Sequence, residues 1–101
     1  MSYNIIGITE KEPNWKKLHS DVFNPIGAIE MFPIDQGDGK FYLGLSIPSK
    51  NMESHPDLWQ ELKKTINQLR NKHGFQVFDL YGGFYVNENN LMELKKQLIG
   101  E

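Results

Sequence analysis

The order in which strand-like and helix-like patterns follow one another constrains the fold of this chain more than any single motif does. Stretches rich in β-branched and aromatic residues, which favour strands, occupy residues 3–9, 26–34, 40–47 and 75–81. Apolar residues spaced three or four positions apart, which favour amphipathic helices, occupy residues 13–24, 54–73 and 87–100. The order is therefore strand, helix, strand, strand, helix, strand, with one further helix after them.

This order predicts an α+β fold of the ferredoxin-like βαββαβ type, a two-layer sandwich with an added C-terminal helix. The added helix is expected to cover the second face of the sheet, to cap an edge of the sheet or to serve a partner. The sequence contains no internal repeat and no long linker. Residues 1–101 are therefore expected to form a single α/β domain.

Signals for helix ends support these assignments. Pro13 is expected at the first position of the short helix. Ser54 and Asp57, three residues apart, resemble a capping box before the long helix, and Asn87 is the expected N-cap of the last helix. The apolar stripe of the long helix consists of Leu58, Leu62, Ile66 and Leu69.

Two reversals of the chain are expected between strands. Residues 35–39, with the sequence DQGDG, have the composition of a tight turn and predict a hairpin. Gly82 and Gly83 match either a tight hairpin, with an extra short strand after the turn, or a bulge in one long strand. In the hairpin, Tyr81 and Phe84 would form a cross-strand aromatic pair.

The composition excludes several classes of protein. The net charge is −2 at pH 7, so nucleic-acid binding is not expected and a partner with a basic surface is favoured. The chain has no cysteine, no signal-peptide pattern and no apolar run of about 18 residues. These features predict a cytoplasmic protein that does not enter a membrane.

The sequence offers little chemistry for catalysis, metals or cofactors. The three histidines, His19, His55 and His73, lie at or near predicted helix ends and are expected to face solvent. Residues 35–39 lack the spacing of a calcium loop, and no nucleophile elbow or phosphate-binding glycine motif is present. No enzyme activity, metal or cofactor is therefore expected.

Two alternatives remain open at this point. Glu30 and Asp79 fall within predicted strands, and two carboxylates meeting on one sheet face near a histidine would suit general acid–base catalysis. Lys40, Phe41 and Tyr42 weakly resemble the aromatic strand motif of RNA-recognition modules, but the glycine after the lysine and the later aromatic positions are missing. Both alternatives are less favoured than a protein-binding role.

The leading hypothesis is a non-catalytic protein-binding module, of the inhibitor or immunity type found as small bacterial domains, that masks a basic surface of a toxin or enzyme. The expected partner-binding residues are acidic and aromatic, because tyrosines supply contact area and carboxylates steer a basic partner. They are Asp35, Asp38, Tyr42, Asp79, Tyr81 and Tyr85. The alternative hypothesis is a small-ligand-binding or regulatory domain that homodimerises through sheet edges or the last helix.

Overall fold

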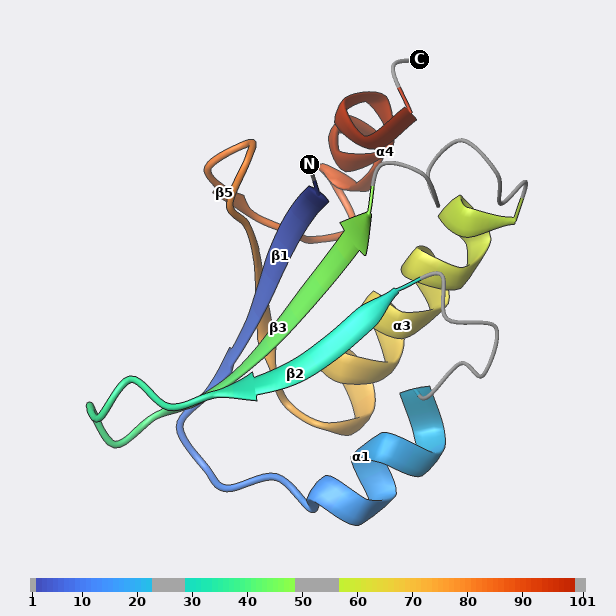
Figure 1. The fold of residues 1–101 in the computed structure, drawn as a ribbon. Helices are drawn as coiled ribbons and strands as arrows, with labels where there is room; N and C mark the ends of the chain where they lie inside the picture. Colours follow the sequence, from blue (N-terminus) through green and yellow to red (C-terminus); the bar gives the residue numbers. More distant parts are fainter. Residues whose placement is uncertain (1, 23–28, 49–56, 100–101) are drawn as a thin grey trace.

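The computed structural model describes residues 2–22, 29–48 and 57–99, which form five strands and three helices (Figure 1). In chain order the elements are β1 (Ser2–Thr9), α1 (Trp15–Val22), β2 (Glu30–Ile34), β3 (Phe41–Pro48), α3 (Leu58–Lys72), β4 (Gln76–Asp79), β5 (Phe84–Tyr85) and α4 (Leu91–Ile99). The predicted α+β class is confirmed. None of the described helices has the length and apolar character needed to cross a membrane.

The strands form one antiparallel sheet in the order β2-β3-β1-β4-β5. Because β3 is antiparallel to both β1 and β2, these two strands run parallel to each other with β3 between them. The β2–β3 hairpin and the β4–β5 hairpin project from opposite ends of the sheet (Figure 1). The sheet therefore presents two separate loop regions.

All three helices pack on the same face of this sheet. Side chains alternate along each strand, so one face collects buried residues such as Ile5, Leu45 and Val77. These residues form one core cluster with Leu62 of α3 and Leu94 of α4. The expected stripe of α3 is confirmed, since Leu58, Leu62, Ile66 and Leu69 are all buried.

The helix starts differ in detail from the predictions. Helix α1 begins after Asn14, whose side-chain oxygen accepts a hydrogen bond from the backbone N–H of Lys17, so Asn14 and not Pro13 sets the start. Asp57 occupies the N-cap of α3 without a side-chain cap bond, and Ser54 lies outside the described residues. The predicted capping box therefore has no confirmed bond.

Asn87 caps a turn that leads into α4, and the helix itself begins four residues later. The Asn87 side-chain oxygen accepts hydrogen bonds from the backbone N–H groups of Asn89 and Asn90, at 2.8 and 3.2 Å. The backbone N–H of Asn87 in turn donates to the side-chain oxygen of Asn90. The Asn90 side-chain amide also donates to the Tyr85 carbonyl at 2.6 Å, which holds the start of α4 beside β5.

The glycine pair forms a hairpin and not a bulge, but the loop is longer than expected. The last paired residues are Asp79 and Phe84, and the Gly83 N–H donates to the Asp79 carbonyl at 2.8 Å. Gly83 alone of the two glycines has a positive φ, of 74°. The predicted pair of Tyr81 with Phe84 is wrong, because Tyr81 lies inside the loop.

Candidate functional site

The six residues predicted to bind a partner do not form one surface. Asp35, Asp38 and Tyr42 belong to the β2–β3 hairpin, whereas Asp79 and Tyr81 lie at the opposite end of the sheet (Figure 1). Their separation follows from the antiparallel register, which pairs Thr9 at one end of β1 with Phe41 and Ile5 towards the other end with Asp79. Tyr85 lies on the short edge strand β5.

Asp79 is a buried structural residue and presents no contact surface, so its assignment to the binding surface is wrong. Its side chain is 0% exposed. One carboxylate oxygen accepts a 2.6 Å hydrogen bond from the Tyr3 hydroxyl, and the other accepts a 3.0 Å bond from the Tyr81 backbone N–H. The carboxylate thereby ties β1 to the loop that follows β4.

Tyr3 completes this buried network. Burial, and then the hydrogen bond to Asp79, raise the pKa of the Tyr3 hydroxyl well above its ordinary value of about 10. The Tyr81 ring packs on the Tyr3 ring with 5.5 Å between centroids. Tyr81 therefore has a structural contact on the helix-covered side of the sheet, although its side chain is largely exposed.

The raised pKa of Tyr3 predicts a loss of stability at alkaline pH. In the unfolded chain Tyr3 ionises near pH 10, whereas in the fold it stays protonated, so above about pH 10 the unfolded state binds fewer protons and the free energy of unfolding falls. We expect Tyr3→Phe to reduce this fall by up to about 1.4 kcal/mol per pH unit. Urea unfolding from about pH 8 to about pH 12 measures the slope. Equal slopes in the wild-type protein and Tyr3→Phe would contradict the assignment, and Tyr81→Phe is the matched control.

The histidines fall into different environments. His73 does not face solvent as predicted, because its side chain is nearly buried and its Nε2 lies 3.0 Å from an Asp21 carboxylate oxygen. This contact joins the end of α3 to α1. His19 is exposed, and His55 lies outside the described residues.

The acid pair considered for catalysis is not formed. Glu30 lies on edge strand β2 and Asp79 on β4, with two strands between them. They also occupy opposite faces of the sheet. Asp79 pairs with the core residue Ile5 on the face that the helices cover, whereas Glu30 pairs with Ser46 on the other face. Within the described ranges, no group of three histidine, aspartate or glutamate side chains is placed to hold a metal ion.

The face of the sheet opposite the helices is the most distinctive surface of the molecule, and we call it the open face. No described helix covers it (Figure 1). One row of directly paired residues crosses all five strands: Phe32, Gly44, Ile6, Phe78 and Tyr85. We call this row the apolar band. Four inter-strand spacings give it a length of about 19 Å.

The band is accessible at both ends and filled in the middle. Phe32 is 45% exposed and Tyr85 is 53% exposed, whereas Ile6 and Phe78 are half-buried by their neighbours. The Phe78 and Tyr85 rings meet edge to face at 4.9 Å. An added Cβ on Gly44 would lie 2.5 Å from the Phe32 ring, so the missing side chain lets this ring lie across β3.

The rows on either side of the band differ in character. On one side, Glu30, Ser46 and Asn4 form a polar row. On the other side, Ile34, Tyr42 and Ile8 extend the apolar surface and Gln76 ends the row. The apolar part of the open face is thus about two rows wide and bounded by polar groups.

Basic side chains are concentrated on the helices, with Lys40 before β3 as an exception beside Asp38. None of the five described strands contains a lysine or arginine. The helices carry Lys16, Lys17, Lys63, Lys64, Arg70, Lys72, Lys95 and Lys96. The open face is bordered by carboxylates, namely Glu30 in the polar row and Asp38 beyond Tyr42.

Asp38 is held beside the open face by Tyr42. The Tyr42 hydroxyl donates to an Asp38 carboxylate oxygen, and this bond lowers the pKa of Asp38 and raises the pKa of Tyr42. Charge repulsion from Tyr85 adds a small part to the rise in the pKa of Tyr42. Asp38, Tyr42 and Tyr85 are the three predicted partner-binding residues that lie on or beside the open face.

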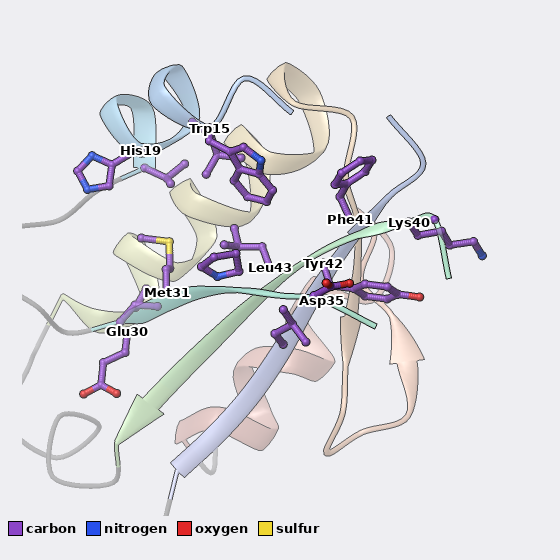
Figure 2. A pocket seen from close by; sticks show the side chains of 15 residues that line it. Trp15, His19, Glu30, Met31, Asp35, Lys40, Phe41, Tyr42 and Leu43 are labelled. Atoms are coloured by element: carbon purple, nitrogen blue, oxygen red, sulfur yellow. The ribbon is translucent and has the colours of Figure 1, made fainter. Parts of the chain in front are cut away.

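A groove between α1 and the β2–β3 edge is a second candidate site (Figure 2). Its volume is about 950 Å³. Trp15, Met31 and Leu43 point into the space between the helix and the strands, whereas Glu30 and Lys40 point outward (Figure 2). Val22 and Ile29 also line the groove, directly before and after residues 23–28, which lie outside the described ranges. The open face is formed by described residues alone.

Sequence reasoning missed most of the open face. Phe32, Ile6 and Phe78 were assigned to strands but not to a binding surface. A signal was present in Gly44, a glycine within a strand, which often marks a close approach of another group. Searches of protein-family models, of curated proteins and of solved structures found no match to this chain.

Proposed function

We propose that this chain is a non-catalytic protein-binding module that docks on a partner through the open face of its sheet. The observation that carries the proposal is the apolar band, which no described helix covers and which ends in two exposed aromatic residues, Phe32 and Tyr85. Contiguous apolar surface with a polar border is typical of protein interaction sites. Aromatic residues at such sites commonly supply much of the binding energy.

The border of the open face favours a partner with a basic surface. Glu30 and Asp38 flank the apolar region, and the strands themselves carry no cation, although Lys40, directly before β3, lies close enough to Asp38 to help lower its pKa. Carboxylates in this position raise the rate of encounter with a basic protein and oppose acidic ones. An inhibitor or immunity-type protein that masks a basic surface of a toxin or enzyme has these properties, and this is the role we propose.

We also propose that β1, α1, β2, β3, α3 and β4 form a ferredoxin-like unit to which β5 and α4 are added. The support is the order of these elements and the position of β3 between the parallel strands β1 and β2. Both helices of such a unit cover one face of the sheet. The other face is then left for a partner.

Homodimerisation through sheet edges is less well supported than docking on the open face. The edge strand β2 contains Pro33, which has no N–H to offer to an added strand. The opposite edge strand, β5, has only two residues. Short edges and edge prolines are common protections against strand pairing.

A second candidate function is binding of a small apolar ligand in the groove between α1 and the β2–β3 edge. Its volume of about 950 Å³ lies within the range of known ligand pockets. Trp15 and Phe41 would supply flat apolar contacts there. Quenching of tryptophan fluorescence by a panel of apolar compounds, lost in Phe41→Ala, would favour this function over the first.

The first test compares what three forms of the protein retain from a lysate of the cells that produce it. We expect the wild-type protein and Tyr81→Ala to retain the same protein in about one-to-one ratio, and Ile6→Lys in the apolar band to retain at least about tenfold less. Tyr81 is a matched control because it is an exposed aromatic residue outside the band. Equal retention by all three forms, or retention of no protein, would remove the open face as the binding site.

A further inference from the structure

We propose that the part of the partner that docks on the apolar band is a basic amphipathic helix, laid across the strands. This inference rests on the proposed function and names the chemistry of the partner segment. Three features of the open face support it: the length of the band, its width, and the positions of the carboxylates on its two sides.

The length and width of the band match one helix. A length of about 19 Å corresponds to a helix of about 13 residues, at 1.5 Å per residue. The row of Ile34, Tyr42 and Ile8 lies beside the band. Neighbouring rows on one face are two residues apart along each strand, so the centres of these two rows are roughly 7 Å apart. A helix about 10 Å in diameter covers these two rows without reaching far into the polar row.

A second sheet fits this surface less well than a helix does. Face-to-face packing of two sheets requires apolar residues over most of both inner faces. Here the row of Glu30, Ser46 and Asn4 would be set against apolar residues of the other sheet. Burying these polar groups without partners is costly.

The two carboxylates beside the band favour basic side chains on both sides of the apolar stripe of the partner's helix. Glu30 lies on one side of the apolar region and Asp38 on the other, and both are exposed. A helix with an apolar stripe at i, i+3, i+4 and i+7 and with lysine or arginine beside the stripe would meet both carboxylates. A second copy of this chain would bring the same carboxylates together, and like charges at an interface are unfavourable.

Nucleic acids and anionic membranes lack the complementary charge for this face. Phenylalanine and tyrosine side chains on an exposed sheet can stack bases, but phosphates must be neutralised by lysine or arginine. No described strand carries either residue. The favoured occupant is therefore a cationic segment of a protein.

The test uses three synthetic peptides of about 14 residues, long enough for a helix that spans the band. The first has a leucine stripe flanked by lysines, the second has glutamates in place of the lysines, and the third has the first composition in a scrambled order without a stripe. Binding is measured by fluorescence anisotropy at low and high salt. We expect the lysine-flanked peptide to bind at least about tenfold more tightly than either of the others, with the difference from the glutamate peptide shrinking at high salt.

A charge-reversal variant makes the test specific for the open face. In Glu30→Lys/Asp38→Lys we expect the preference to reverse, so that the glutamate-flanked peptide binds at least about fivefold more tightly than the lysine-flanked one. The matched control is Glu12→Lys/Glu93→Lys, which changes the net charge equally at exposed positions outside the sheet. In this control the original preference should remain.

Several results would overturn the inference. Equal binding of the scrambled and striped peptides, an unchanged preference in Glu30→Lys/Asp38→Lys, or a reversal in the control variant would each do so. Tighter binding of a single-stranded RNA or of anionic vesicles than of the lysine-flanked peptide would also overturn it. If no peptide binds but a lysate protein is retained by the wild-type protein and lost in Ile6→Lys, the inference of a helical partner segment is wrong and the proposed function stands. If band-dependent retention fails as well, the proposed function is wrong.

Discussion

Replacing Asp79 with alanine is expected to lower the free energy of unfolding by about 2–3 kcal/mol. The substitution removes the acceptor for two donors at once, the hydroxyl of Tyr3 and the backbone N–H of Tyr81. Tyr3 is itself buried, and after the substitution its hydroxyl keeps only a longer contact that it already has, 3.2 Å to the side-chain oxygen of Gln97. Loss of the short Tyr3 bond and of the acceptor for the part-buried Tyr81 N–H costs about 1–3 kcal/mol, and the loss of side-chain volume adds a cavity.

Urea unfolding followed by tryptophan fluorescence measures this effect, because both Trp15 and Trp59 pack partly against the core. Asp79→Asn should cost less, since the amide keeps an oxygen acceptor in the same place. Leu80→Ala, at the exposed neighbouring position, is the control and should change stability by less than about 0.5 kcal/mol. An Asp79→Ala protein as stable as the control would show that the buried network does not support the fold.

The largest expected effect on binding comes from a charge in the middle of the apolar band. Ile6 lies on the central strand β1, directly between Gly44 and Phe78 in the row. Ile6→Lys would place an ammonium group against the apolar stripe of the partner and against its flanking cations. We expect the affinity for the retained partner to fall at least about a hundredfold, or about 2.7 kcal/mol.

Folding of the variant must be separated from its binding. Ile6 faces away from the core and is half-buried, so a lysine there can extend its charged end to water. Isothermal titration measures the affinity, and unfolding by urea checks the fold. Tyr85→Lys, at the exposed end of the band, provides a second variant if Ile6→Lys fails to fold. Wild-type affinity in a folded Ile6→Lys protein would exclude the band from the interface.

The class of the fold and the order of its elements could be predicted from sequence because they depend on local patterns. The apolar stripe of α3 and the turn at residues 35–39 are examples, since each is encoded within a few consecutive positions. The length of the loop after β4 was harder to predict, because a glycine pair is compatible with turns of different length. The structure has the longer of these loops, in which the Asp79 carboxylate accepts a hydrogen bond from the Tyr81 backbone N–H.

The binding surface could not be predicted because it depends on register between distant strands. Asp79 lies on the same buried face of β4 as Val77, but its hydrogen-bond partner Tyr3 is 76 residues away in sequence. Similarly, Phe32, Ile6 and Phe78 become neighbours only through the pairing of four strands. In residues 75–81 both alternating sets contain large apolar side chains, so the sequence alone does not show which face the helices cover.

The most direct test of the open face as a docking surface is site-specific photocrosslinking in the cells that produce the protein. A photoreactive phenylalanine analogue would replace Phe32, Tyr85 or Tyr81, one at a time, since all three rings are exposed. We expect positions 32 and 85, at the two ends of the apolar band, to crosslink to the same protein, and position 81 to give no such product. Crosslinking from position 81 alone, or equally from all three positions, would contradict docking through the open face.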